Sequence, residues 1–248
     1  METFIIIDLI AKLEIDPEDI DKNNIYLKKY TDNTNFHTVY GSKIKPILDK
    51  ILSFVGLIIL SPLYGLISLA VYLDDPGPVF FKQKRVGKDK HFFILHKYRS
   101  MKMSTPHNIP THQLRNPEQY ITRVGRLLRK TSLDELPQIW DIFRGKMSFV
   151  GPRPALWNQE DLIADREQYG ANNVFPGLTG WAQINGRDEL EISEKAMLDG
   201  VYVERLKHGG WYAFFGDVKC IVGTIYNVLC QDGVVEGGTG RSKKKDER

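Results

Sequence analysis

Cysteine is scarce in this sequence, and the two cysteines present show no pattern of a redox or metal site. Cys220 and Cys230 lie ten positions apart in an apolar segment, without the spacing of metal ligands. This excludes a disulfide-rich secreted domain and a zinc finger, and it predicts buried thiols in a reducing compartment. A secretory leader is not predicted either, because Glu2 precedes the short apolar patch at residues 4–7 and Asp8 interrupts it.

Signals for nucleic-acid binding are also missing, although most of the chain is basic. The 248 residues carry a net charge of +3, but residues 1–42 hold eight acids and four lysines, so the remainder carries +7. No zinc-finger spacing and no RNA-binding aromatic motif accompany these cations, which argues against nucleic acid as a partner. A basic body is instead expected to face anionic lipid headgroups or phosphorylated substrates.

The chain does contain one long uncharged run, the 23 residues Ile51–Leu73. At about 1.5 Å per residue it is long enough to span a bilayer. Pro62 in its middle, however, removes a backbone donor and its ring clashes with the carbonyl of Ile58, so a kink is predicted. The hydroxyl of Ser61 is available to satisfy a carbonyl freed in this way.

Positive charge flanks the apolar run on both sides, so the positive-inside rule selects neither orientation. The cations are Lys43, Lys45 and Lys50 before it, and Lys82, Lys84, Arg85, Lys88 and Lys90 after it. A kinked transmembrane helix and a re-entrant helix-break-helix that enters and leaves by one leaflet both fit the run itself. A buried helix of a soluble protein fits less well.

The remaining pattern predicts short helices around a small sheet. Two strands, at residues 79–81 and 92–95, are expected to be joined by a basic turn at Gly87. Four helices are expected to follow: a basic amphipathic helix at 121–130, a short helix at 137–144, a solvated helix at 156–169 and an apolar helix at 211–229. The basic helix suits an anionic surface. The last one is either a core helix or an interfacial helix.

The stretch Thr131–Gln138 is the most informative in the chain, because two adjacent carboxylates precede a proline. As structure alone, Ser132 and Glu135 form a capping box with solvent-facing acids. A helix that starts at Pro137 is easier to build, and it leaves Asp134 and Glu135 on the approach to a helix N-terminus.

This arrangement also suits phosphoryl chemistry. Ionised Asp134 is a candidate nucleophile, and Glu135 is a candidate Mg²⁺ ligand, since Mg²⁺ binds one or two carboxylates together with substrate phosphates. An anionic nucleophile that attacks a diphosphate needs neutralising cations. Nearby arginines and lysine supply them: Arg123, Arg126, Arg129 and Lys130. Arg153, held between two prolines, presents a further guanidinium on a stiff backbone.

Six ordered blocks carry a resemblance to a known family. They are Ser61-Pro62 within the apolar run, Lys84–Gly87, Lys97–Met101, Arg123–Gln138, Met147–Pro154 and Pro176–Arg187. Together, over about residues 43–230, the chain resembles the bacterial monotopic phosphoglycosyl transferases, also called bacterial sugar transferases, in their short form. Departures include Lys146 in place of the usual Asp, and Asp188 and Ile192 in the part associated with substrate discrimination.

The resemblance implies a two-step transfer. Asp134 would attack the sugar-proximal phosphate of a UDP-sugar and release UMP, and undecaprenyl phosphate would then take the phosphosugar from the enzyme. Glu135 would hold Mg²⁺, and Ser61-Pro62 would break the re-entrant helix. Substrate contacts are implied for five cations: Lys97, Arg99, Arg129, Arg153 and Arg187. Such a reaction starts exopolysaccharide, capsule or other glycoconjugate assembly, and enzymes of that assembly are further candidate partners.

The resemblance also implies a location and an organisation. We expect a mixed α/β protein, helix-rich with a small sheet, bound to membrane lipid at the cytoplasmic face of the bacterial inner membrane. It would be monotopic, with a re-entrant helix and interfacial amphipathic helices. The expected parts are an acidic appendage (1–42), the re-entrant segment (43–75), the catalytic domain (76–230) and a basic tail (231–248).

Two other functions remain open from the residues. A conventional membrane-associated glycosyltransferase would transfer the sugar without its phosphate and release UDP. The chain lacks an obvious Asp-x-Asp metal motif in a nucleotide-sugar fold, which argues against this function. A non-catalytic membrane-anchored interaction module would use Asp134 and Glu135 only as a helix cap.

Overall fold

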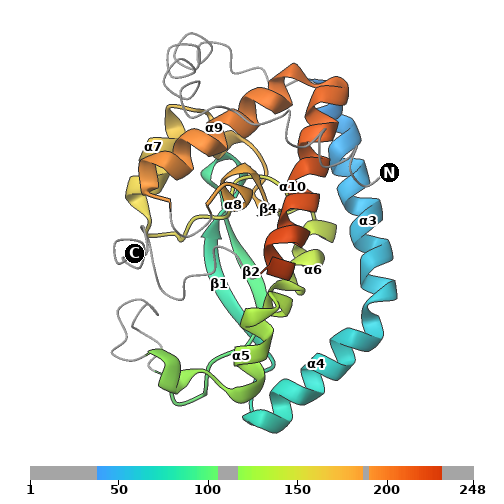
Figure 1. Cartoon of the computed structure of the whole chain (residues 1–248), viewed down its shortest axis with the longest axis vertical. Helices are drawn as coiled ribbons and strands as arrows, with labels where there is room; N and C mark the ends of the chain where they lie inside the picture. Colours follow the sequence, from blue (N-terminus) through green and yellow to red (C-terminus); the bar gives the residue numbers. More distant parts are fainter. Residues whose placement is uncertain (1–37, 106–116, 187–189, 231–248) are drawn as a thin grey trace.

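A computed structural model of the chain describes residues 38–105, 117–186 and 190–230. Most of the expected acidic appendage, the basic tail and the predicted substrate-binding residue Arg187 lie outside these ranges. Within them the protein is helix-rich, as the sequence predicts, and it has two small sheets where one was expected. A β-hairpin runs through the middle, and two long helices lie along one side (Figure 1).

The apolar run forms two helices with a sharp bend between them. A π-helical turn, η1 (Tyr40–Ile44), leads into α3 (Lys45–Ile59), and α4 (Ser61–Asp74) follows at an angle of 63°. The predicted kink is confirmed, and the Ser61 hydroxyl donates to the Ile58 carbonyl over 2.8 Å. In the described part of the chain no single helix is long and apolar enough to cross a membrane; only this bent pair meets that test, by length and composition alone.

The predicted hairpin is present and longer than expected. Strands β1 (Phe80–Val86) and β2 (Phe92–Tyr98) pair antiparallel from Phe80–Tyr98 to Val86–Phe92, with the short turn η2 (Lys88–Lys90) between them. Lys82 and Lys84 belong to the strand, because one side of the hairpin is solvated and their long cationic side chains extend from it. The segment after Arg153 adds to this sheet, since the Val86 N–H donates to the Ala155 carbonyl over 3.0 Å.

Helix α5 (Arg123–Lys130) is held between α4 and the hairpin. Its N-cap Thr122 accepts a bond from the Gly125 N–H, and Asp74 at the end of α4 accepts one from the Val124 N–H. A Cβ on Gly125 would lie 2.1 Å from the Ser100 carbonyl oxygen, so only glycine permits this close approach. Leu128 is buried here, whereas Leu127 is exposed.

The acidic pair lies on a short 3-10 turn, η5 (Leu133–Glu135), after which α6 (Gln138–Phe143) begins with Pro137 as its N-cap. The Ser132 side chain makes no capping bond and its backbone is left-handed, so the capping-box interpretation is wrong. Leu136 nevertheless has helical dihedral angles despite the following proline. Its carbonyl accepts bonds from the Ile139 N–H and the Tyr64 hydroxyl, which hold this conformation.

The other elements form a second body of helices around two parallel three-residue strands, β3 (Ser148–Val150) and β4 (Gly177–Thr179). They are α7 (Glu160–Glu167), the turn η6 (Ala171–Asn173), α8 (Trp181–Ile184), α9 (Ile192–His208) and α10 (Gly210–Cys230). The turn η4 (Pro117–Tyr120) lies instead directly before α5, where the Lys102 N–H donates to the Tyr120 carbonyl over 2.8 Å. The predicted solvated helix at 156–169 is shorter than expected and buries Arg166, whose guanidinium pairs with Asp199 of α9. Helix α10 runs beside α3 (Figure 1).

Candidate active site

Glu135 is the centre of a buried carboxylate–cation cluster. Its Oε1 accepts bonds from Lys97 Nζ and Arg153 Nη2, each over 2.7 Å, and Arg153 Nη1 lies 3.4 Å from Oε2. Burial alone would raise the pKa of this carboxyl, but the charges of Arg153 and Lys97 hold that pKa well below its usual range. Glu135 is therefore ionised at neutral pH and keeps both cations in place.

Asp134 precedes Glu135 in the chain, but its carboxyl is in a different electrostatic environment. Burial raises the pKa of its carboxyl above the usual range. The charge of Lys97 opposes this rise, as do those of Arg129 and Arg153, whereas the charge of Glu135 adds to it. Burial outweighs the opposing cations, so the carboxylate is more basic than one in water, which suits a nucleophile that must attack a phosphate.

Three separate segments bring these side chains together. Lys97 comes from β2, Asp134 and Glu135 from η5, and Arg153 from the turn after β3. Arg129 reaches the same region from α5, where its Nε donates to the Ser100 hydroxyl over 2.9 Å. The cluster thus unites three of the six blocks that the sequence singled out: Lys97–Met101, Arg123–Gln138 and Met147–Pro154.

Helix α4 of the bent pair packs against the segment that carries Asp134 and Glu135. The Tyr64 hydroxyl of α4 donates to the Leu136 carbonyl over 2.6 Å, and the Tyr98 hydroxyl of β2 donates to the Tyr64 carbonyl over 3.1 Å. Ile67 and Val71 of α4 pack with Tyr98 in one apolar cluster, joined by side chains of α5 and η5. The position of the two carboxylates therefore depends on how α4 docks.

Arg99, a predicted substrate-binding residue, is not part of the cluster. Arg99 is buried and its guanidinium binds the carboxylate and the carbonyl of Asp75, at the end of α4. Its observed contacts therefore anchor the bent pair to the hairpin, and its predicted role toward substrate remains a prediction. Arg187 lies outside the described residues.

Arg85 is a residue that sequence reasoning did not assign to the site. Its Nη1 donates to the Pro154 carbonyl over 2.8 Å, directly after Arg153. Burial lowers the pKa of its guanidinium to about 10, with the nearby charge of Arg153 acting in the same direction and that of Glu135 opposing it. Its position in the Lys84–Gly87 block was the available signal, but a basic strand residue alone does not reveal which carbonyl it will bind.

The carboxylates fit a magnesium ion that is shared with a phosphorylated substrate. Among the residues that the structure describes, no three His, Cys, Asp or Glu side chains gather to hold a metal by themselves. Mg²⁺ commonly takes only one or two carboxylates and completes its shell with phosphates and water. Asp134 and Glu135 supply such hard oxygen donors, and Glu135 Oε2 has only the longer Arg153 contact.

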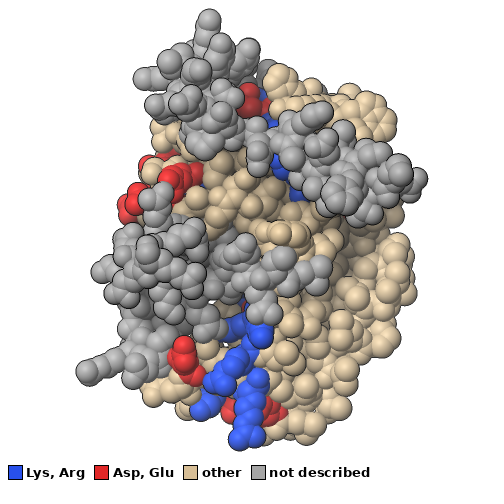
Figure 2. Space-filling view, viewed as in Figure 1, with Lys and Arg blue, Asp and Glu red and all other residues tan. Residues whose placement is uncertain are grey.

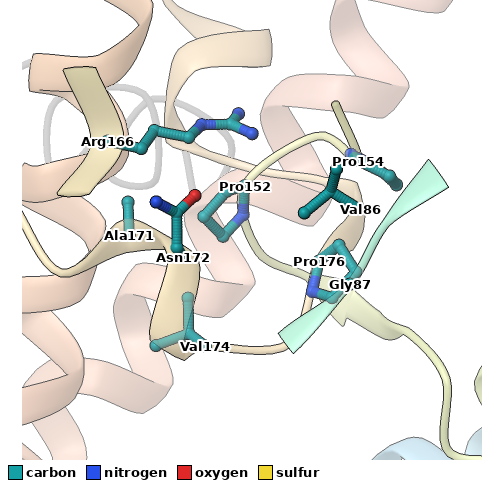
Figure 3. A pocket seen from close by; sticks show the side chains of 9 residues that line it. All are labelled: Val86, Gly87, Pro152, Pro154, Arg166, Ala171, Asn172, Val174 and Pro176. Carbon is teal, nitrogen blue, oxygen red and sulfur yellow. The ribbon is translucent and has the colours of Figure 1, made fainter. Parts of the chain in front are cut away.

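A small cavity lies behind the turn that carries Arg153, lined by Pro152, Pro154 and Pro176 together with Arg166 and Asn172 (Figure 3). Its volume of about 10 Å³ is close to that needed for a single water molecule. It therefore cannot be a sugar or nucleotide site.

Comparisons with known proteins agree with this geometry. The bacterial sugar transferase family matches residues 40–231. The chain is 39% identical over 196 residues to the UDP-glucose:undecaprenyl-phosphate glucose-1-phosphate transferase of Xanthomonas campestris pv. campestris, covering 75% of this chain and 39% of that protein. It is 40% identical over 164 residues to the uncharacterized sugar transferase EpsL of Bacillus subtilis (strain 168), covering 66% and 76%. It is 32% identical over 212 residues to the exopolysaccharide production protein ExoY of Rhizobium meliloti (strain 1021), covering 78% and 88%. The chain thus spans about two fifths of the glucose-1-phosphate transferase and most of the other two relatives.

Proposed function

This chain belongs to the bacterial sugar transferase family, and we propose that it transfers a sugar 1-phosphate from a UDP-sugar to undecaprenyl phosphate, with release of UMP. The observation that carries the proposal is the cluster itself: one carboxylate fixed by two cations, beside a second, more basic carboxylate. Related proteins named for glucose-1-phosphate transfer and exopolysaccharide production support the same reaction class.

In the first step an oxygen of Asp134 attacks the sugar-proximal phosphorus. A new P–O bond forms, the diphosphate bond breaks, and its electron pair leaves with UMP. In the second step an oxygen of undecaprenyl phosphate attacks the same phosphorus and the Asp134–phosphorus bond breaks, which restores the carboxylate.

The cations of the cluster would stabilise the charge that develops on the phosphoryl oxygens. Lys97 and Arg153 already lie within hydrogen-bonding distance of Glu135, so they are held in position before substrate arrives. Arg85 keeps the Arg153 turn against the hairpin. Glu135 would hold Mg²⁺, which when bound supplies further charge neutralisation to the diphosphate.

Helix α3 supports a membrane location because the side that faces the protein is polar and the side that faces away from it is largely apolar. Lys45, Asp49 and Ser53 face the protein and are buried. Apart from Lys50, its exposed side chains are apolar and between 44% and 69% exposed: Ile47, Ile51, Leu52, Phe54, Val55, Ile58 and Ile59. The flank of α3 and α4 shows almost no charged side chain on the face seen in Figure 2. Such a surface is stable only against an apolar medium.

The proposed membrane mode is re-entrant, on the cytoplasmic leaflet of the bacterial inner membrane. Tyr64 and Asp74 of α4 bind η5 and α5, so the far end of the bent pair returns to the same body from which α3 starts. A straight span would place those contacts on opposite sides of a bilayer. Exposed apolar side chains on α10, including Trp211, Phe215 and Ile225, and the exposed cations of α5 are suited to the interface of the same leaflet.

The decisive test is the nucleotide product. Purified protein in nanodiscs would be incubated with Mg²⁺, undecaprenyl phosphate and a panel of UDP-sugars, in parallel with Asp134→Asn and with Asp161→Asn on exposed α7 as a matched control. We expect UMP from one donor, unchanged in the control and lost in Asp134→Asn. Release of UDP would identify an ordinary glycosyltransferase, and full activity of Asp134→Asn would overturn the covalent mechanism.

A further inference from the structure

The buried stripe of α3 makes contacts with two different parts of the protein. Lys45 Nζ binds Asp217 of α10 over 2.7 Å, and one turn later Asp49 binds the start of β3. Ser53, one turn further, donates only within its own helix in the contacts described, to the Lys50 carbonyl. The three side chains share one face, because they are four residues apart.

Asp49 holds β3 with both carboxylate oxygens. Oδ2 accepts a bond from the Ser148 hydroxyl over 2.6 Å, and Oδ1 accepts one from the Phe149 N–H over 3.2 Å. Asp49 is 9% exposed and Ser148 is 1% exposed, so these bonds form away from water and are strengthened by the low local dielectric.

The backbone from Phe149 to Arg153 is short and constrained. The Gly151 N–H donates to the Thr179 carbonyl over 2.8 Å, and the Pro152 carbonyl accepts from the Gly177 N–H over 2.9 Å. Prolines on both sides of Arg153 fix two of its neighbouring dihedral angles. A displacement of β3 is therefore passed to Arg153 rather than absorbed by a flexible loop.

We infer that Asp49 is a positioning residue for the proposed reaction: it sets Arg153 against Glu135 through β3, and so couples the docking of the apolar-faced helix to the phosphate-binding cation. This inference rests on the proposed function for its kinetic consequence. Its structural part, that Asp49 links α3 to the segment 148–154 (the Asp49 tie), does not depend on the proposed function.

The test compares Asp49→Asn and Ser148→Ala with Ser53→Ala, the matched control on the same buried stripe. Hydrogen exchange of the peptide covering 148–155 is measured on the full chain in nanodiscs. Asp49→Asn and Ser148→Ala are expected to accelerate this exchange, and Ser53→Ala to leave it unchanged. Equal exchange in all three variants would overturn the tie, whether or not the protein proves to be a transferase. Ser148→Ala removes only a hydroxyl, so it provides the test if Asp49→Asn does not fold.

The kinetic arm is a double-mutant cycle with Arg153→Lys, measured as UMP release from the donor that the panel identifies. Asp49→Asn alone is expected to lower kcat by about 10- to 100-fold, because small misplacements of a binding group have effects of that size. In the Arg153→Lys background the same change is expected to lower kcat by less than about threefold, since coupled residues are not additive. Multiplicative losses would show that Asp49 acts only on general stability and would overturn the positioning role. Absence of UMP from the wild-type protein with every donor would refute the proposed function and the kinetic claim, leaving exchange to decide the tie.

Discussion

Glu135→Gln is expected to destabilise the protein although it removes only one charge. Glu135 is 9% exposed, with Lys97 Nζ and Arg153 Nη2 each 2.7 Å from Oε1. A hydrogen bond to a charged group contributes about 1.5–3 kcal/mol net, and removing one partner of a buried ion pair costs about 3–5 kcal/mol. The amide oxygen of Gln retains one acceptor, so we expect a loss of about 3 kcal/mol, which for a chain of this size lowers Tm by about 6–12 °C.

Asp134→Asn, one residue away, is expected to act in the opposite direction at neutral pH. Burial raises the pKa of Asp134, so the folded protein binds this proton more tightly than the unfolded chain, and ionisation opposes folding. Asparagine removes that ionisation. The variant is therefore expected to be inactive but to have a Tm above that of the wild type.

The effect of each substitution on stability depends on pH, and the direction of the pKa shift of Glu135 or Asp134 determines how. The stabilisation from Glu135 is fully present above its unfolded-state pKa of 4.5 and is lost as the pH falls through its lower folded pKa. The gain from Asp134→Asn is present above the raised folded pKa of Asp134 and vanishes as the pH falls toward its unfolded value of 3.8.

The measurement is differential scanning fluorimetry of wild type and both variants in the same nanodiscs, at neutral and at mildly acidic pH. Opposite shifts of Tm at neutral pH are expected. Shifts in the same direction, or no loss in Glu135→Gln, would refute the assignment of one carboxylate to holding cations and the other to chemistry.

Four further outcomes are expected. Arg153→Lys should lower UMP release by about 10²–10³-fold with the fold intact, because one preorganised donor is lost; an unchanged rate would remove Arg153 from the site. Chelation with EDTA should abolish UMP release and added Mg²⁺ should restore it, so activity that survives EDTA would contradict the magnesium proposal. Gly125→Ala should lower Tm strongly, since its Cβ would lie 2.1 Å from the Ser100 carbonyl oxygen, whereas Gly65→Ala, with no atom within 4 Å of its Cβ, should not. Cys220 should resist alkylation in the native state, because burial raises the pKa of its thiol to about 12, and peptide mass spectrometry at mildly alkaline pH would detect any modification.

The sequence was sufficient for features that depend on local pattern. The hairpin follows from apolar alternation around Gly87, the kink from Pro62, and the start of α6 from Pro137. The candidate site was predicted from residues that carry charge in a distinctive order, and the fold brings Lys97 and Arg153 to Glu135.

The features that were missed depend on contacts distant in sequence. Helix α9 (Ile192–His208) shows no single apolar face, because it buries polar side chains such as Asp199 and Arg205 beside apolar ones. The roles of Arg99 and Arg85 depend on which carbonyl or carboxylate the fold places beside them, at Asp75 and Pro154. Asp49 before an apolar run resembles a flanking charge until β3, 99 residues later, is in place.

The inward polar stripe of α3 has a consequence for biosynthesis. Lys45 and its partner Asp217 are separated by 172 residues. At a translation rate of about 5–20 residues per second, Asp217 is made roughly 9–34 s after Lys45. During that interval, in the proposed membrane mode, the apolar outer face of α3 could already enter lipid, while Lys45 still lacks Asp217. In the proposed membrane mode the helix would reach its final depth only when α10 is complete, so insertion would finish at the end of synthesis rather than at the beginning.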